Sequence, residues 1–181
     1  MILHLLGLTN KYDFAMLQQA IITYLKATLS GLNVCYVYNV ANFYQLKDLC
    51  SACSAFVDLH ALEVMSSEGF LSLSQAVLTD LVHRDSFFAP ELDIYHGVVR
   101  WMKHNEVDQG SASDLLRGIR LQLIPLANLL EEVRPAGYFD ADCILDAIQM
   151  ANQTLDIKLG YRGLLSKTLY MYLVSPKCCA V

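Results

Sequence analysis

The chain has 181 residues, a mass of 20.3 kDa and a formal net charge of -5, and this length accommodates one domain or two small ones. Its acidic balance leaves no broad basic surface for a phosphate backbone, so nucleic acid is not an expected partner. Hydrophobic residues make up 55% of the sequence, yet no window of about 18 residues stays apolar, so no membrane span is expected.

The first amphipathic pattern follows the short apolar opening of the chain. It places one apolar stripe at Phe14, Leu17, Ile21, Tyr24 and Leu25. Asp13 precedes the stripe and is a residue type that commonly caps a helix, whereas Gly31 follows it and favours a helix end. The pattern therefore predicts a helix between these two residues, with the stripe facing inward.

The next segment, 34–44, is short and rich in aromatic residues, and its pattern fits either a strand or a helix. Helix is the preferred interpretation because strongly helical patterns flank it. The helix that follows has an inward stripe of Leu46, Leu49, Cys50, Cys53, Phe56 and Val57. Residues 64–70 are then expected to form a short link.

Cys50 and Cys53 form a C-x-x-C pair, which is compatible with a zinc site or with core packing. Free cysteine behaves as a small buried hydrophobe, and both residues lie on the inward stripe of their helix. A zinc site would need a second pair of ligands at suitable spacing, and the sequence has none. Core packing in a reduced, intracellular protein is the preferred interpretation, and no metal ligand is assigned.

The middle of the chain predicts two further amphipathic helices. The first buries Leu73, Val77, Leu78 and Leu81, and the second buries Ile94, Val98, Trp101 and Met102. Pro90 suits the start of the second helix, and the charges of Glu91 and Asp93 suit its positive end. The polar stretch 105–113 is expected to be a loop.

Helical spacing continues to about residue 150. Apolar residues recur at Leu126, Leu129, Leu130 and Val133, and then at Ile144, Leu145 and Ile148. Asp140 is the expected cap of the last helix. Because no segment shows sustained strand alternation, the predicted fold class is all-α, with short helices packed as antiparallel pairs.

Two segments resemble catalytic signatures of protein kinases. They are His83-Arg84-Asp85 and Ala89-Pro90-Glu91. They stand only three residues apart, Pro90 occupies the place of the required asparagine, and no glycine-rich phosphate loop is present. The histidines and paired carboxylates also lack the spacing of a hydrolase, so His83, His96, Glu131 and Glu132 are expected to be solvated. No catalytic, cofactor-binding or metal-binding residue is predicted, and the chain is not expected to be an enzyme.

Several segments together resemble the BACK domain, the helical module that follows BTB/POZ domains in cullin-3 ubiquitin-ligase adaptors. They are 68–74 (EGFLSLS), 84–87 (RDSF), 89–91 (APE), 101–105 (WMKHN) and 119–121 (IRL). Gln122 departs from the family pattern, because a proline usually follows this arginine and leucine. The resemblance extends over roughly residues 2–165 and implies an all-α fold.

The resemblance also implies a domain organisation. Residues 1–30 resemble the last two helices of a BTB/POZ domain, residues 31–150 a BACK domain, and residues 151–181 a linker with a divergent tail after Ser166. The family continues beyond this point into further domains, so a truncated form is expected. The high apolar content would then come from helices that normally cover a BTB sheet and here lack it.

The family's role is that of a non-catalytic, cytoplasmic substrate adaptor for a cullin-3 E3 ubiquitin ligase. Carried over by residue, the candidate cullin contacts are Tyr12, Val34, Tyr44, Leu46 and Leu49. The last four belong to the so-called 3-box helix pair, residues 33–60, although apolar residues at helical spacing are also typical of a core. Cullin-3 binding is expected to be weakened or lost without the upstream BTB part, and the ubiquitination substrate is unknown.

A second function class stays open. The chain is also compatible with a structural or regulatory fragment that pairs with full-length BTB-BACK proteins, or with itself, and no longer binds cullin. Neither role requires a cofactor, nucleic acid or a membrane.

Overall fold

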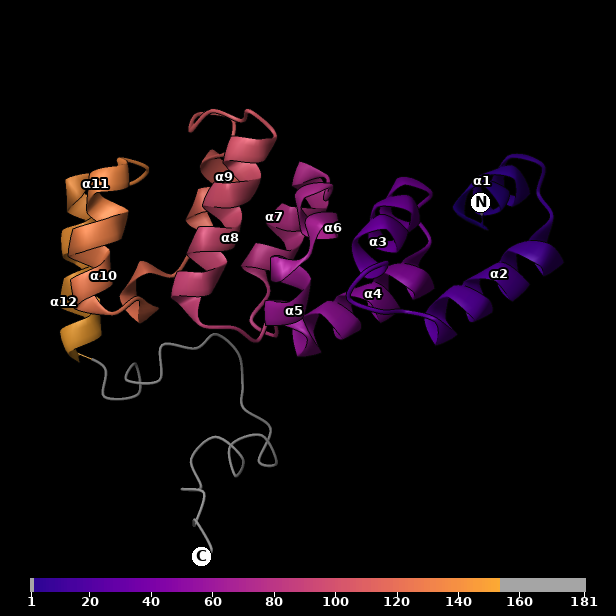
Figure 1. Ribbon diagram of the computed structural model, residues 1–181, viewed down its shortest axis with the longest axis horizontal. Coiled ribbons are helices and arrows are strands. Elements are labelled where there is room, and N and C mark those ends of the chain that lie inside the picture. Colours follow the sequence, from indigo (N-terminus) through magenta and orange to yellow (C-terminus); the bar gives the residue numbers. More distant parts are fainter. Residues whose placement is uncertain (1, 154–181) are drawn as a thin grey trace, which may run out of the picture.

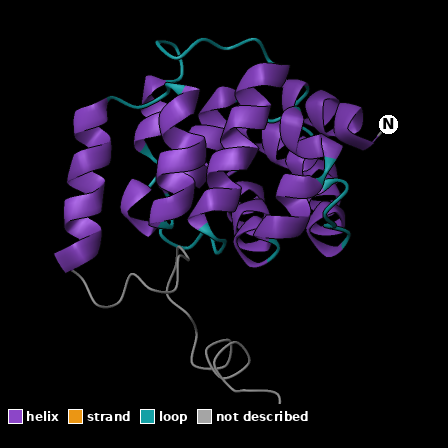
Figure 2. Cartoon of the chain, turned by 60° about the vertical axis from the view of Figure 1, so that its left-hand side comes forward, coloured by secondary structure: helices purple, strands orange, loops and turns teal. Residues whose placement is uncertain are grey.

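The computed structural model describes residues 2–153, and within them it contains helices and no strand (Figure 2). The helices form an elongated row in chain order, with the N-terminal pair at one end and the last helix at the other (Figure 1). The predicted all-α fold class is therefore confirmed.

The N-terminal pair consists of α1 (Ile2–Lys11) and α2 (Ala15–Ala27). Asp13 does not cap α2, because it lies in the turn with a φ of 56° and Phe14 takes the position before the helix. Aspartate tolerates this left-handed conformation better than most residues.

The predicted inward stripe of α2 is only partly buried. Ile21 and Leu25 are buried, but Phe14, Leu17 and Tyr24 are each at least half exposed. The prediction was wrong for these three residues because α2 is apolar around most of its circumference. Among the described helices, α2 makes its main contacts with α1 and α4.

Helices α3 (Val34–Phe43) and α4 (Lys47–Leu59) form the next pair. The helical interpretation of segment 34–44 is confirmed. Gln45 makes the turn between the helices with a φ of 55°. The buried hydrophobic residues of the pair are Val34, Cys35, Val37, Tyr38, Ala41, Leu49, Cys53 and Val57.

The expected link at 64–70 is instead covered by two short helices, α5 (Ala61–Ser66) and α6 (Glu68–Leu71). Ser67 separates them in an extended conformation, and its hydroxyl accepts a hydrogen bond from the backbone N–H of Phe70 at 3.3 Å. This side-chain cap starts a new helical turn where the pattern indicated a break.

Helices α7 (Gln75–His83) and α8 (Glu91–His104) bury the residues that their patterns predict. The indole N–H of Trp101 on α8 donates to the carbonyl of Leu73 at 2.9 Å. Glu91 is fully buried at the start of α8 and accepts the backbone N–H of Arg120 at 2.7 Å. This carboxylate therefore joins α8 to a later segment in addition to its place at the helix start.

The C-terminal part begins with α9 (Ser113–Arg117) and the 3-10 turn η1 (Leu121–Leu123). A helical segment follows, made of α10 (Leu126–Asn128), the π turn η2 (Leu129–Val133) and α11 (Arg134–Ala136). The last described helix is α12 (Ala141–Gln153), which begins directly after Asp140 as predicted.

The π turn changes which leucines are buried. Leu129 and Val133 are buried, whereas Leu126 and Leu130 are exposed. A π turn closes its hydrogen bonds over one more residue than an α-helix does, so the apolar face shifts around the axis. The stripe that α-helical spacing predicts for these four residues is therefore only half correct.

Candidate protein-binding groove

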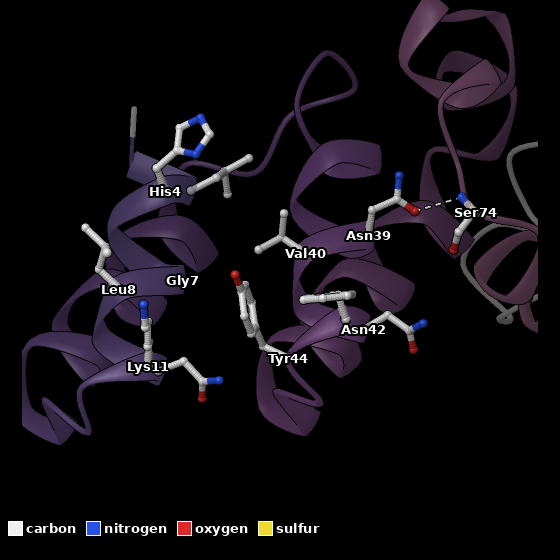
Figure 3. A pocket seen from close by; sticks show the side chains of 12 residues that line it. His4, Gly7, Leu8, Lys11, Asn39, Val40, Asn42, Tyr44 and Ser74 are labelled. Carbon is white, nitrogen blue, oxygen red and sulfur yellow. Dashed lines mark hydrogen bonds between the residues drawn. The ribbon is translucent and has the colours of Figure 1, made fainter.

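A groove of about 1060 Å³ lies between α1 and α3 (Figure 3). Its lining comprises Leu3, His4, Gly7, Leu8, Asn10, Lys11, Asn39, Val40, Asn42, Phe43, Tyr44 and Ser74. One wall comes from α1 and the other from α3 with the residue that follows it. Ser74, just before α7, closes one end.

The shape of the groove depends on a close approach between Tyr44 and Gly7. The Tyr44 hydroxyl points toward α1, where a Cβ on Gly7 would lie 2.5 Å from it (Figure 3). No Cβ atom tolerates that distance, so glycine at this position allows the tyrosine to lie between the two helices. The rings of Tyr44 and Phe43 pack edge to face with centroids 5.0 Å apart.

Polar side chains at the rim are held in place or face outward. The Asn39 side chain donates to the carbonyl of Ser72 at 2.7 Å and accepts the backbone N–H of Ser74 at 2.8 Å (Figure 3). No carboxylate lines the groove, whereas Lys11 and His4 do. An apolar floor with a few placed polar groups is typical of a ligand-binding site.

Phe43 is the most exposed large apolar side chain of this groove, at 77%. Leu8 on the α1 wall of the groove is 50% exposed. Contiguous exposed apolar surface of this kind marks interaction sites in folded proteins.

The structure separates the five predicted contact residues into two groups. Tyr44 lines the groove, Tyr12 is 58% exposed beside α1, and Leu46 is partly buried. Val34 and Leu49 are fully buried in the core. This burial corrects the expected contact surface, because a side chain with no exposed area supports the helices and does not touch a partner.

Sequence reasoning missed Leu3, Leu8, Val40 and Phe43 as groove residues. A signal was available for α3, because its buried positions occupy one side of the helix and leave Val40 and Phe43 on the other. No comparable signal pairs α1 with α3, since residues from separate segments meet there only in the folded chain.

Of the C-x-x-C pair, Cys53 lies in the core as predicted and Cys50 packs against it with partial exposure, whereas Cys143 is exposed. Cys53 is fully buried, and burial raises its pKa to about 12, while burial raises the pKa of Cys35 to about 11. Thiolates are the form that binds metals, so these pKa values disfavour ligation near neutral pH. Within residues 2–153, no group of three or more His, Cys, Asp or Glu side chains is arranged to hold a metal ion.

Three of the groups that were expected to be solvated have partners, and His83 contacts the carbonyl of Thr79 at 2.9 Å. His96 on α8 lies 2.9 Å from Glu132 on η2, and both side chains are about half exposed. Hydrogen bonds from Asn128 and His96 lower the pKa of Glu132. This pair connects two helical segments at the surface, where such interactions contribute little to stability.

None of the helices between residues 2 and 153 is both long and apolar enough to cross a lipid bilayer.

Comparison with known proteins relates this fold to a family. The family model described as BACK, BTB And C-terminal Kelch, matches residues 34–134. This match includes α3 and with it one wall of the groove.

The individual relatives agree with that match. BTB/POZ domain-containing protein 9 from Homo sapiens is 43% identical over 164 residues, which cover 91% of this chain and 26% of that protein. The Drosophila melanogaster protein of the same name is 38% identical over 88% of this chain and 22% of its own length. Human Kelch-like protein 31 is 30% identical over 64% of this chain and 19% of its own length.

The chain spans about a quarter of the length of these BTB/POZ relatives. The helical row of the fold, the matched segment 34–134 and these identities agree with one another. It belongs to the BACK domain family, among relatives named BTB/POZ domain-containing protein 9.

Proposed function

We propose that the chain is a non-catalytic protein-interaction module, the BACK region of a cytoplasmic substrate adaptor for a cullin-3 E3 ubiquitin ligase. Its membership of an interaction-domain family supports this role. The observation that carries it furthest is the apolar groove between α1 and α3, with Phe43 exposed on its wall.

In this proposal the groove receives the N-terminal segment of cullin-3. Phe43, Tyr44 and Val40 supply apolar contact area, and Tyr12 and Leu46 are further contacts outside the groove lining. Val34 and Leu49 hold α3 and α4 together behind the groove. The rest of the adaptor would position a ubiquitination substrate, which the proposal leaves unassigned.

Replacing Phe43 by aspartate should weaken cullin-3 binding at least tenfold. The substitution removes an aromatic anchor that is 77% exposed and places a charge where the partner's apolar side chains would be desolvated. Isothermal titration calorimetry of the intact chain with the cullin-3 N-terminal domain, including its N-terminal segment, measures the change in Kd.

A matched control is Leu126→Asp, because Leu126 is also exposed, at 55%, but lies on α10. This control should bind as the unmodified chain does. If the unmodified chain gives no heat at high micromolar concentration, or if both variants bind equally well, the proposed adaptor contact is wrong.

A second role is favoured by the exposed apolar surface of α1 and α2. This surface comprises Leu5, Leu8, Tyr12, Phe14, Met16, Leu17 and Tyr24. The rings of Tyr12 and Phe14 lie 6.5 Å apart and connect its two helices. Such a surface suits a fragment that pairs with BTB-BACK proteins and no longer binds cullin.

Replacing Leu17 and Tyr24 by aspartate should abolish this association, because both side chains lie on the surface and are at least half exposed. Light scattering of the chain, alone and mixed with a full-length BTB-BACK protein, measures the mass of any complex. A chain that stays monomeric and unbound in both samples would exclude the second role.

A further inference from the structure

The groove between α1 and α3 has a row of polar groups along its α1 wall. His4, Gly7 and Lys11 line the groove and follow one another at spacings of three and four residues, which places them on one face of the helix. Tyr44 reaches this face from the opposite wall, and its hydroxyl lies against Gly7 (Figure 3). The His4 ring, the Tyr44 hydroxyl and the Lys11 ammonium therefore follow one another along α1.

The Lys11 ammonium and the Tyr44 hydroxyl face the same part of the groove. Side chains of a helix point back toward its N-terminus, so the ammonium extends from its own turn toward the turn that contains Gly7. Figure 3 shows this direction, with the Tyr44 hydroxyl on the other side of the same space. One helical turn is about 5.4 Å along the axis, a span that a single carboxylate bridges with one oxygen to each donor.

Both groups lack an acceptor among the described residues. No ion pair within residues 2–153 includes Lys11, and its ammonium instead lies 5.3 Å from the centroid of the Tyr12 ring. In the same part of the chain the Tyr44 hydroxyl has no hydrogen-bond partner. No carboxylate lines the groove, although the chain as a whole has a net charge of -5. An occupant of the groove would therefore supply the missing acceptor.

The apolar part of the lining restricts the chemistry of that occupant. Leu3 and Leu8 on the α1 wall and Val40 and Phe43 on the α3 wall flank the two donors. A nucleic acid backbone would need a series of cations, whereas this lining contains a single lysine. Apolar walls around one cation suit a protein segment in which an acidic side chain stands between apolar ones.

We propose that the groove selects a protein segment that carries an acidic side chain between apolar neighbours. The carboxylate accepts hydrogen bonds from the Lys11 ammonium and the Tyr44 hydroxyl, and the apolar neighbours pack on Leu8 and Phe43. Such a charge-assisted contact is stronger in a partly desolvated groove than on open surface. This inference rests on the binding role proposed for the groove above, and it adds the chemistry that decides which segments bind.

Selection from a display library of random peptides on the intact chain tests the proposal. Peptides enriched on the unmodified chain should carry aspartate or glutamate between apolar residues. On the Lys11→Glu variant they should carry lysine or arginine there instead, because a carboxylate replaces the cation of the groove. Lys11 is exposed, so this variant keeps its fold. Lys26→Glu is the matched control, since Lys26 is exposed on α2 outside the groove lining, and it should leave the selection unchanged.

Fluorescence anisotropy of one selected peptide then locates the contact. Replacing its acidic residue by the corresponding amide should weaken binding about fivefold or more, and Lys11→Gln should weaken binding of the acidic peptide by a similar factor but not that of the amide peptide. Tyr44→Phe keeps the ring beside Phe43 and should weaken only the acidic peptide, by about threefold. The proposal is overturned if no peptide with an acidic residue is enriched, if Lys11→Glu leaves the selection unchanged, or if Lys26→Glu alters it equally.

Competition with the cullin-3 N-terminal domain separates this inference from the proposed function. Acidic peptides that bind through Lys11 on a chain that does not bind cullin-3 would contradict the partner proposed above and support the charge selection. A cullin-3 domain that binds the unmodified chain and the Lys11→Glu variant equally, on a chain that enriches no acidic peptide, would overturn the charge selection and leave the cullin-3 contact standing.

Discussion

Replacing Trp101 by alanine is expected to lower the free energy of unfolding by about 4 kcal/mol. Trp101 is the single tryptophan of the chain and is only 3% exposed on α8. Its removal leaves a large cavity among the helices, and it also leaves the carbonyl of Leu73 without the indole N–H that it accepts at 2.9 Å. Both effects destabilise the folded state, because the apolar contacts and the buried hydrogen bond are lost together.

Urea denaturation followed by circular dichroism measures this loss, since the variant has no tryptophan fluorescence to follow. Trp101→Phe keeps much of the buried ring but not the N–H donor, so its expected loss is smaller, about 2 kcal/mol. Leu126→Ala, at a side chain that is 55% exposed, should change stability by less than about 0.5 kcal/mol. A loss below about 1 kcal/mol for Trp101→Ala would contradict the place of this ring in the core.

The helices around Trp101 are also the part of the fold that sequence periodicity predicts best. In α7 and α8, polar and apolar residues alternate at the helical period, so one face of each helix is clearly apolar and that face is buried. In α2 the apolar residues exceed what one side of a helix can bury. The pattern therefore does not distinguish Leu25, which is buried, from Leu17, which is exposed.

The groove could not be predicted in the same way. Tyr44 was a candidate through the family resemblance, but its neighbour across the groove is Gly7, on a different helix. Periodicity describes one helix at a time, and the distance between two helices depends on how their side chains fit. Val34 and Leu49 are candidate contacts through the same resemblance, and the structure buries both side chains in the core.

The segment that resembles a kinase signature shows how tertiary contacts give a motif its role. Arg84 follows α7 and reaches Asp58 near the end of α4, with the guanidinium 2.7 Å from the carboxylate. Ser86 donates to the same carboxylate at 2.6 Å, and the backbone N–H of Phe88 reaches the carbonyl of Asp58 at 3.3 Å. Phe87 lies between Ser86 and Phe88 in the sequence, and its side chain is buried. These contacts hold the turn between α7 and α8 against α4.

Replacing Arg84 by alanine should therefore lower the free energy of unfolding by about 2 to 3 kcal/mol. The Asp58 side chain is only 11% exposed, and the hydrogen bond to it raises the pKa of Arg84. Without the guanidinium, the largely desolvated Asp58 carboxylate keeps one side-chain donor among the described residues, the hydroxyl of Ser86. Because Arg84 itself is 33% exposed, water replaces part of the loss, and the expected value lies below that of a fully buried pair.

Arg120→Ala is the matched control. Arg120 pairs with Asp85, which lies in the turn between α7 and α8 but is 83% exposed. An exposed pair of this kind contributes less than about 1 kcal/mol. Thermal and urea denaturation of both variants, with the double variant Asp58→Ala and Arg84→Ala, separates the two contributions. The double variant should be at most about 1 kcal/mol less stable than Arg84→Ala alone. Removing the unpaired carboxylate also removes the cost of its desolvation. Equal losses for Arg84→Ala and Arg120→Ala would show that the buried pair does not hold this turn, and the turn's stability would then depend on Phe87 and the backbone contact at Phe88.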